Sequence, residues 1–399
     1  MLLSPAAPRA DAAPAAPPIG GGRPKLLFLV TEDWYFCSHR LPAARAARDA
    51  GFEVVVATRV RAHAETIRDE GFALRPLPWR RRGDGPFGGL RALAAIVRLY
   101  RAERPDILHH VALKPVLFGG LAARLAFARH RRPAVLAAVM GMGSGFAGRG
   151  WTRHALALGL RLAGGGRVIV QNPEDGAALG RLGVAPERIA LIRGSGVDTG
   201  HFIPAPEPPG PTIALALVAR MLRSKGVLDA AAAVRRLRGE GHAVELLLAG
   251  PADPDNPDSL DEPTLRALAA EPGIEWLGPV ADVREVWARA AIALLPSTYG
   301  EGLPKALLEA AACGRPMVAT DTPGCREIAR DGETGLLVPA ADVAALAAAI
   351  AALARDPARR QALGRAARSL AERDFAEPVI AAQTLALYCT MLAEKRGSA

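Results

Sequence analysis

The stretch IALLPSTYGEGLPKALLEAAACGRPMVAT, residues 292 to 320, predicts a strand, a helix and a second strand in close succession. Its two ends are apolar throughout rather than alternating, which indicates strands that are buried on both faces. The Ala- and Leu-rich middle has helical spacing. A strand, helix and strand of this kind form one unit of a parallel sheet with helices on either side.

The same alternation of apolar runs and helical stretches fills the rest of the chain, in two halves. The predicted strands of the first half are KLLFLVT, FEVVVAT, DILHHV, AVLAAV, RVIVQN and RIALIRG; those of the second are TIALALVAR, VELLLAG, IEWLGPV, IALLPST, PMVAT and TGLLVP. We therefore predict an α/β protein of two doubly wound parallel-sheet domains. A ligand is expected in a cleft between them, at the carboxyl ends of both sheets.

The segment PAPEPPGP, residues 204–211, has five prolines in eight residues and is predicted to be the linker. It divides a first domain, 25–203, from a second, 212–375. Residues 376–399 are expected to form a helix that could pack back on the first domain. Residues 1–24, rich in Ala, Pro and Gly, are expected to be a disordered lead.

Composition argues against a secreted or membrane-spanning protein. The four cysteines have no CxxC spacing, so neither a zinc site nor a disulfide framework is indicated. No apolar run reaches the roughly 18 residues that a spanning helix needs. We expect a cytoplasmic protein.

Positive charge is concentrated in the first half of the chain. Residues 1–205 hold 29 Lys and Arg against 15 Asp and Glu, whereas residues 206–399 hold 21 against 25. The basic half is compatible with an ordinary solvated surface, with an anionic membrane surface or with nucleic acid. Residues 80–105 are the expected membrane contact, and they carry too few aromatic residues to stack on bases.

The helix in the opening stretch is predicted to begin near Gly302 or Leu303, because Pro304 suits a first helical turn. The free N–H groups and partial positive charge of a helix start attract phosphate. Gly302 would let a ligand come close to the backbone. The sequence thus predicts a phosphate site here.

Two glutamates flank that helix start. Helical spacing predicts that Gly302, Lys305 and Glu309 share one face. Glu309 could then accept hydrogen bonds from the diol of a ribose, and Glu301 from a hydroxyl of a sugar beyond the phosphates. The pair would bracket a sugar nucleotide. The alternative is structural, with Glu301 favoured by the helix dipole and Glu309 on the surface.

The segment YGEGLPKALLEAAACGRPMVATDTPGCREIARDGETGLLVP closely resembles the region with two glutamates eight residues apart in retaining glycosyltransferases of family 4. SHRLPAARAARDAGFEVVVAT, DILHHVALKPVLFGGLAARLA and VMGMGSGF are similar to further segments of that family, in its capsular and O-antigen branch. The resemblance runs over nearly the whole chain from residue 25. It implies the GT-B fold of two facing Rossmann-like domains, and donor binding by Gly302, Leu303, Pro304, Lys305 and Glu309.

The resemblance also assigns roles around the diphosphate of the donor. Arg220 ends a predicted strand and Lys225 precedes a helix, and in the resembling family these two cations grip the phosphates as the nucleotide leaves. With Glu301 they form the expected catalytic group. Val280 is expected to hold the base through its backbone. No Asp-x-Asp metal motif is expected beside the candidate donor site, so we expect a reaction without metal or other cofactor.

The first domain is expected to bind the acceptor, and it lacks the GxGxxG fingerprint of dinucleotide oxidoreductases. Ser38 is a plausible helix cap and His39 opens a helix, although a lone histidine is often structural. His109 matches a catalytic histidine of the family, but Val111 replaces the second histidine of the family's His-x-His. Further acceptor-side residues implied here are Lys114, Gly141 and Gly143. PGCREI, residues 323–328, resembles a family turn or is a plain helix start.

The predicted function is transfer of a sugar, with retention, from a nucleotide donor such as a UDP-sugar to a saccharide linked to polyprenyl diphosphate. The resembling branch does this at the inner face of the cell membrane during surface polysaccharide assembly, which implies a peripheral membrane protein. One alternative is a sugar-nucleotide 2-epimerase of the same architecture. Another is a nonenzymatic basic module that binds lipid or nucleic acid, although such a module would need neither glutamates nor paired cations.

Overall fold

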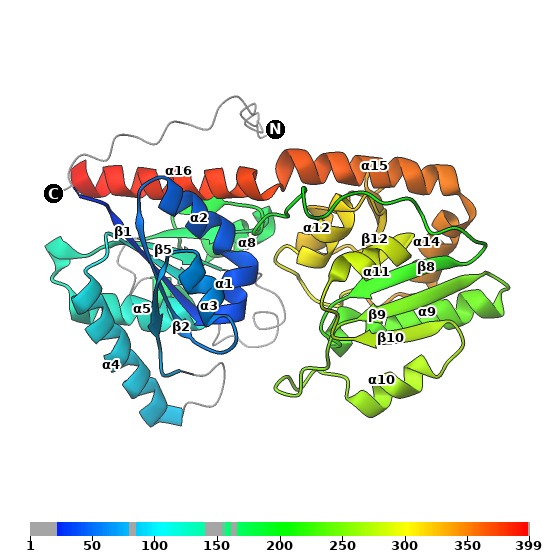
Figure 1. The fold of residues 1–399 in the computed structure, drawn as a ribbon, viewed down its shortest axis with the longest axis horizontal. Coiled ribbons are helices and arrows are strands. Elements are labelled where there is room, and N and C mark those ends of the chain that lie inside the picture. The colour runs from blue at the N-terminus through cyan, green and yellow to red at the C-terminus, as the bar shows by residue number, and fades with distance from the viewer. Residues whose placement is uncertain (1–21, 80–84, 140–153, 155, 161–165, 398–399) are drawn as a thin grey trace. The chain divides into compact units, whose positions relative to one another are not determined.

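The computed structural model describes residues 22–79, 85–139, 154, 156–160 and 166–397. It contains two parallel sheets flanked by helices (Figure 1). The first has seven strands in the order β3-β2-β1-β4-β5-β6-β7, and the second has six in the order β10-β9-β8-β11-β12-β13. The predicted α/β fold with two doubly wound sheets is confirmed.

The strands of the first sheet are β1 (Lys25–Glu32), β2 (Glu53–Arg59), β3 (Ala73–Pro76), β4 (Ile107–Val111), β5 (Ala134–Ala138), β6 (Arg167–Val170) and β7 (Ile189–Leu191). Those of the second are β8 (Ile213–Val218), β9 (Val244–Ala249), β10 (Ile274–Gly278), β11 (Ile292–Leu295), β12 (Met317–Thr320) and β13 (Gly335–Val338). Every predicted run contains a strand. The sequence did not predict β3, a four-residue edge strand that is half exposed and has no apolar run.

The helices of the described residues up to Ala269 are α1 (Asp33–His39), α2 (Leu41–Asp49), α3 (Ala64–Asp69), α4 (Gly85–Glu103), α5 (Leu113–Ala126), α8 (Pro173–Arg181), α9 (Val227–Gly239) and α10 (Glu262–Ala269). They are followed by α11 (Val283–Arg289), α12 (Lys305–Ala312), α13 (Pro323–Arg326), α14 (Val343–Arg355), α15 (Pro357–Asp374) and α16 (Glu377–Gly397). None of the helices described is long and apolar enough to cross a membrane.

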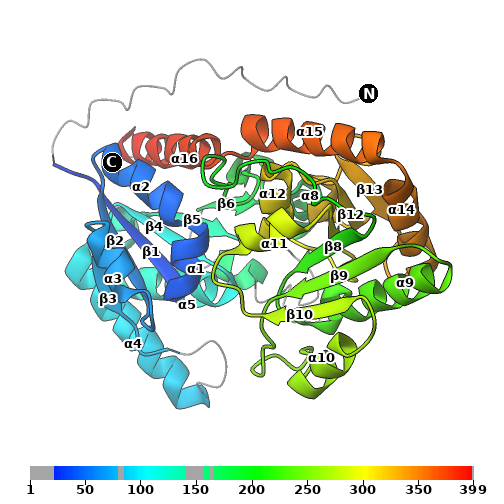
Figure 2. The same cartoon turned by 45° about the vertical axis from the view of Figure 1, so that its right-hand side comes forward.

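Alternate residues of each central strand feed two separate cores. In β8, Leu215 and Leu217 pack with α9, α10 and α14, whereas Ala214 and Ala216 pack with α11, α12 and α15. Figure 2 shows α9 and α14 on one face of this sheet and α11 and α12 on the other. Burial on both faces explains why these strands are apolar throughout.

The first sheet follows the same rule. Leu27 and Leu29 of β1 pack with α4 and α5. Phe28, between them, contacts Phe36 of α1 and Tyr388 of α16 through ring edges. Helix α16 is thereby part of the packing on this face.

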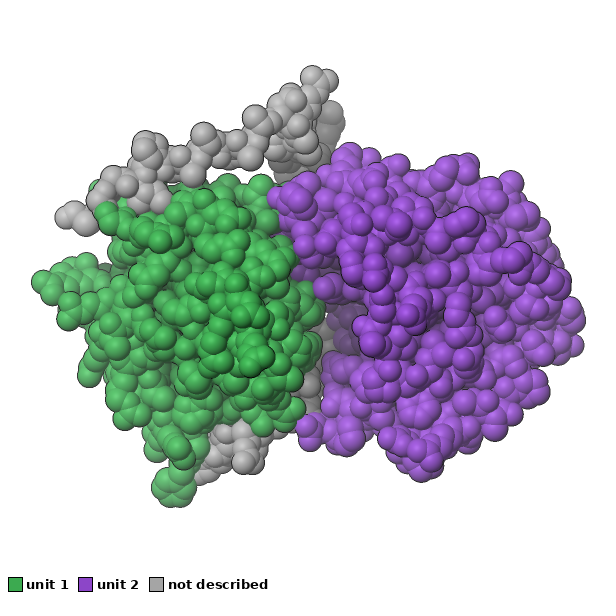
Figure 3. Space-filling model, viewed as in Figure 1, with its two compact units in different colours: residues 1–137, 159–166, 381–399 green, residues 138–158, 167–380 purple. Residues whose placement is uncertain are grey.

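The chain divides by its contacts into two compact units, coloured in Figure 3. The first comprises residues 1–137, 159–166 and 381–399, and the second comprises 138–158 and 167–380. The second unit thus holds the whole six-stranded sheet.

Each sheet has one point at which its strand order reverses. In the first sheet this point lies between β1 and β4, and in the second between β8 and β11. The loops that leave two such strands diverge to opposite faces, and ligands of open α/β sheets bind in the crevice between them. Arg220 and Lys225 follow β8, and Glu301 follows β11.

Candidate active site

Three loops of the second unit are joined through their backbones at the β8/β11 reversal. The loop after β8 donates from Met221 N–H to the carbonyl of Pro251 at 2.9 Å, in the loop after β9. It also accepts, at Ser224, a 2.9 Å hydrogen bond from Thr298 N–H, in the loop after β11. Side chains from all three loops are therefore held close together.

Lys225 and Glu301 form the centre of this cluster. The Lys225 Nζ lies 2.6 Å from Glu301 Oε1, and the Ser297 hydroxyl donates to the same oxygen at 2.5 Å. The carbonyl of Ser297 in turn accepts from the Thr320 hydroxyl at 2.6 Å. The carboxylate of Glu301 is thus oriented by two donors, one of them fixed to the neighbouring strand.

Gly226 makes this close approach possible. Its φ of +73° is a left-handed conformation that favours glycine, and it precedes α9. A Cβ at this position would lie 2.1 Å from the Pro296 carbonyl oxygen. Only glycine lets the loop after β8 rest on the loop after β11.

The ammonium group of Lys225 is mostly buried and charged. Burial by itself lowers its pKa, but Glu301 and Tyr299 outweigh that effect, so the pKa lies above its ordinary value. The Nζ also lies 5.5 Å from the centre of the Tyr299 ring. Ser297 and Tyr299 were not singled out in the sequence; the only signal was their position between a strand end and Glu301.

Arg220 pairs with a residue that the sequence did not reveal. Its guanidinium group binds the carboxylate of Asp253, in the loop after β9. Asp253 lies 33 residues further along the chain. The side chain of Arg220 remains 37% exposed, so it is still accessible to a ligand.

The neighbourhood of Arg220 corrects one detail of the sequence analysis. Asp253 and Asp255 form an Asp-x-Asp pair that is distant from Arg220 in sequence, but the fold brings Asp253 against it. Among the described residues, no group of three or more His, Cys, Asp or Glu side chains is arranged to hold a metal ion. The Asp253 carboxylate forms an ion pair with Arg220 of the same chain.

The helix after Glu301 begins later than predicted. Helix α12 starts at Lys305, and Pro304 is its N-cap with extended backbone (φ −69°, ψ 115°). The first helical acceptor is the Pro304 carbonyl, while the Gly302 carbonyl lies 3.4 Å from Asn172 Nδ2. Gly302 is therefore in the loop, and only Lys305 and Glu309 of the three predicted residues share a helix face.

Close packing fixes the loop at Gly302 and Leu303. A Cβ on Gly324 of α13 would lie 2.0 Å from the Gly302 carbonyl oxygen, and one on Gly194 would lie 2.5 Å from the Leu303 side chain. Two glycines thus hold the loop before α12 from opposite segments. The turn PGCREI, which contains Gly324, is a short helix with this supporting role.

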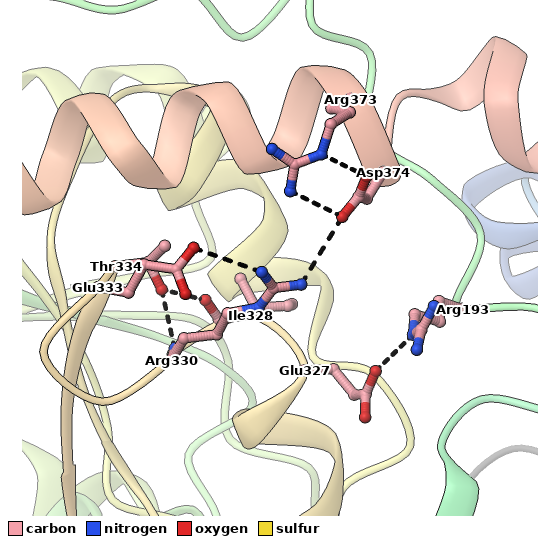
Figure 4. Close-up of polar contacts among 8 residues, drawn as sticks. All are labelled: Arg193, Glu327, Ile328, Arg330, Glu333, Thr334, Arg373 and Asp374. Atoms are coloured by element: carbon pink, nitrogen blue, oxygen red, sulfur yellow. Dashed lines mark hydrogen bonds and ion pairs between the residues drawn. The ribbon is translucent and has the colours of Figure 1, made fainter. Parts of the chain in front are cut away.

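Polar contacts also fix the segment that follows α13, residues 327–334 (Figure 4). Glu327 binds Arg193, and Arg330 reaches Asp374 at the end of α15 with an N–O distance of 3.6 Å. The Thr334 hydroxyl accepts from Arg330 N–H at 2.8 Å and donates to the Ile328 carbonyl. These contacts connect α13, which packs against the loop of the candidate site, and the segment after it with helix α15.

Glu309 lies one turn along α12 from Lys305 and is half-buried. Burial raises the pKa of its carboxyl to about 7, against the opposing effect of Lys305. The group can therefore change its charge near neutral pH. Val280, in the loop before α11, is half-buried and packs against the core cluster that contains α11 and α12.

The histidines of β4 in the first unit are fully buried. His109 Nδ1 lies 2.7 Å from the Tyr388 hydroxyl, and His110 Nε2 lies 2.8 Å from the Tyr100 hydroxyl. Burial lowers the pKa of His109 well below its usual range and that of His110 to about 3. Both rings are neutral at neutral pH. The catalytic role of His109 stays a prediction, which this burial does not support.

Three of the other acceptor-side residues, Ser38, His39 and Lys114, lie in the helices that follow β1 and β4, beside the reversal of the first sheet. Ser38 and His39 are in the last turn of α1 (Asp33–His39), and the residue before α2 is Arg40, so the prediction that Ser38 caps a helix and His39 opens one is wrong. The Ser38 hydroxyl is 2.6 Å from His39 Nδ1, and the His39 ring stacks on Tyr35 with centres 4.2 Å apart. Lys114 lies at the start of α5, and its Nζ lies over the ring of Trp79. Gly141 and Gly143 lie outside the described residues.

Comparison with protein families identifies the class. Residues 25–161 match the model described as "Glycosyl transferase 4-like", and residues 212–356 match "Glycosyl transferases group 1". Together the two matches cover well over half of the chain. The protein belongs to this family of glycosyltransferases, as the resemblance implied.

Curated relatives extend the comparison. An alpha-maltose-1-phosphate synthase of Mycolicibacterium smegmatis is 34% identical over 51% of this chain and 57% of its own length. A putative colanic acid biosynthesis glycosyltransferase of Salmonella typhimurium is 33% identical over 53% of each chain. The chain thus spans a little over half the length of these relatives.

A third relative aligns along nearly its whole length. It is the N,N'-diacetylbacillosaminyl-diphospho-undecaprenol alpha-1,3-N-acetylgalactosaminyltransferase of Campylobacter jejuni. It is 26% identical over 88% of this chain and 94% of its own.

Solved structures share the fold. A sucrose-phosphate synthase of Thermosynechococcus elongatus has a TM-score of 0.79 at 22% identity, covering 94% of this chain and 100% of its own. HepE of Anabaena in complex with UDP and glucose has a TM-score of 0.76 at 19% identity, covering 92% and 100%. The fold is GT-B, as predicted.

Proposed function

We propose that this glycosyltransferase moves a sugar from a UDP-sugar, with retention at the anomeric carbon, to a saccharide carried on a lipid diphosphate. The observation that carries the proposal is the cluster of Lys225, Glu301 and Arg220 at the β8/β11 reversal. Two fixed cations beside an oriented carboxylate suit a ligand with phosphates at one end and hydroxyl groups at the other.

In the proposed reaction, Arg220, Lys225 and the backbone N–H groups before α12 bind the diphosphate. Negative charge grows on these phosphates as the nucleotide leaves, so cations that are held in place beforehand stabilise the transition state more than the ground state. These cations supply the positive charge in a reaction that we propose to need no metal. Glu301 would bind a hydroxyl of the donor sugar, and Glu309 the ribose.

Retention is proposed to occur by attack on the same face from which the nucleotide leaves. A double displacement would need a carboxylate nucleophile about 5 Å from a second carboxyl group across the bond. Glu301 is engaged by Lys225 and Ser297, which suits hydroxyl recognition better than nucleophilic attack. The departing diphosphate would then help to remove the proton of the acceptor hydroxyl.

The lipid-linked acceptor is proposed from the name of the Campylobacter relative, which includes diphospho-undecaprenol. The UDP donor is proposed from the complexes of HepE with UDP. An acceptor embedded in the membrane would require a peripheral enzyme at its inner face.

Helix α4 offers a surface for that membrane. Phe87 and Leu90, one turn apart at its start, are 85% and 65% exposed, and Arg91 and Arg98 are exposed further along. Apolar tips beside arginines suit an anionic lipid surface. Arg80, Arg81 and Arg82, which precede the helix, lie outside the described residues.

Product analysis by NMR tests the proposal. The purified protein would be incubated with UDP-sugars and a saccharide on a short-chain polyprenyl diphosphate, with and without EDTA. We expect a product with the anomeric configuration of the donor, formed equally in both samples. An inverted product would overturn retention, loss with EDTA would overturn metal independence, and conversion of the donor without acceptor would indicate an epimerase.

A further inference from the structure

An acidic segment rests on the cationic loop of the candidate site. The loop after β9 carries Asp253, Asp255 and Asp258 within six residues. It lies against the loop after β8, which carries Arg220, Arg223 and Lys225. The same loop that presents cations for a diphosphate therefore already has carboxylates beside it.

The acidic segment is held firmly by the backbone. Gly250, at the end of β9, has a φ of +143°, and a Cβ there would lie 1.8 Å from the carbonyl oxygen of Ala219, the residue before Arg220. Arg223 N–H donates to the Asp258 carbonyl at 2.9 Å, and the Asp258 carboxylate accepts from Ser224 N–H at 3.1 Å. Only glycine permits this contact between the two strand ends.

Asp253 is fixed within this segment. Its own N–H donates to the Ser259 hydroxyl at 2.9 Å, and its side chain is only 14% exposed. The loop therefore already orders this carboxylate beside Arg220, so that little further conformational entropy is lost when the ion pair forms. Such a carboxylate competes effectively with other anions for the same guanidinium group.

We propose that Asp253 is an internal competitor of the donor phosphates for Arg220, and so sets how much negative charge a ligand must bring. This inference rests on the proposed function of the site. A phosphate that binds Arg220 must displace the Asp253 carboxylate or share the guanidinium with it against their mutual repulsion. A diphosphate meets this condition more readily than a monophosphate or an uncharged nucleoside.

Calorimetric titration with UDP tests the inference on the full chain. We expect Asp253→Asn to lower the Kd for UDP about two- to fivefold at low salt, the range of a partly exposed ion pair. The gain should shrink as salt is raised. Binding of uridine should not change.

Matched variants identify the cause. Asp255→Asn removes the same charge two residues away, at an exposed position, and should change the Kd for UDP much less than Asp253→Asn does. In an Arg220→Gln background, the gain from Asp253→Asn should vanish, because the competition acts through Arg220. Asp253→Ser, with circular dichroism of each variant, guards against a folding artefact.

Weaker UDP binding by Asp253→Asn would overturn the inference and make Asp253 a residue that positions Arg220. Loss of UDP binding on addition of EDTA, together with loss in the Asp253 variants, would make it a metal ligand instead. Titration with pyrophosphate separates this inference from the proposed function. If pyrophosphate but not UDP binds, and binds more tightly to the variant, the competition stands and the UDP-sugar proposal fails; if neither binds, both fail.

Discussion

The two sheets reverse their strand order in the same way, yet the titratable residues near the two reversals lie in different surroundings. Arg220, Lys225 and Glu301 lie in loops beyond the ends of β8 and β11. Lys225 pairs with Glu301 and Arg220 with Asp253, and the Arg220 side chain stays 37% exposed. His109 and His110 lie inside β4, where neither has any exposed surface. Polar residues before and after a strand end near a reversal therefore differ in burial.

The difference follows from the packing of a parallel sheet. A residue within a central strand must point into one of two cores, so a polar side chain there needs a buried partner. Tyr388 and Tyr100 provide that partner for the two histidines. A residue after the strand end faces the crevice instead. We infer that the β8/β11 reversal is the chemical centre and that the β4 histidines mainly support the fold.

The largest expected effect is on catalysis at the second reversal. Lys225→Ala removes the ammonium that pairs with Glu301 and should lower the rate of transfer about 100- to 1,000-fold, the effect of losing one preorganised electrostatic group. Arg236→Ala, at an exposed position of α9, is the control and should leave the rate unchanged. Initial rates with a UDP-sugar measure both. A Lys225 variant with full activity would place the chemistry elsewhere.

Next in size is the effect of Gly226→Ala on stability. The new Cβ would meet the Pro296 carbonyl and the backbone would keep an unfavourable φ, so we expect a loss of about 1–3 kcal/mol in the free energy of unfolding. Gly239→Ala, at the other end of α9, meets nothing within 4 Å and should not destabilise the protein. Urea titrations of both variants give the comparison. Equal stability of the two variants would show that the loops are not held as described.

A smaller effect is expected on the pH dependence of UDP binding. With a pKa of about 7, the Glu309 carboxyl is mostly protonated at pH 6 and mostly ionised at pH 8, and only the carboxylate can accept both hydrogen bonds of a diol. UDP affinity should rise up to about tenfold over this range. Because UDP itself titrates, Glu309→Gln is the reference and should show a clearly weaker dependence. Identical profiles would remove Glu309 from the ribose site.

The smallest effect is expected in the first sheet. Tyr388→Phe removes the hydroxyl that pairs with His109 Nδ1, and should cost about 1 kcal/mol of unfolding free energy while the rate of transfer stays the same. Thr390→Ala, exposed on the same helix, should change neither quantity. A large loss of transfer rate in folded Tyr388→Phe protein would bring His109 back into the reaction and erase the contrast between the two reversals.

The sequence predicted most of the fold because the strands are buried on both faces and therefore read as apolar runs. It missed β3, whose edge position leaves half its residues exposed. It also began α12 too early, because proline suits both a first helical turn and, as found for Pro304, the residue that precedes the helix.

The site was predictable only where its residues follow strand ends. Arg220, Lys225 and Glu301 could be found in this way, and the resemblance to family 4 supported their assignment to the site. The pairing of Arg220 with Asp253 could not, because it depends on how Gly250 brings two strand ends together. The partner of His109 was equally hidden, since Tyr388 lies in a helix 279 residues away in the chain.

Calorimetric titration of the wild-type protein with UDP, GDP and ADP, beside Glu301→Gln, tests the central claim most directly. Glu301→Gln keeps the shape of the side chain but loses the charge that pairs with Lys225. We predict that the wild-type protein binds UDP selectively and with release of heat, and that the Kd for UDP is different in Glu301→Gln. Absence of binding by all three nucleotides, or binding that is identical in the variant, would contradict the assignment of the β8/β11 reversal as the donor site.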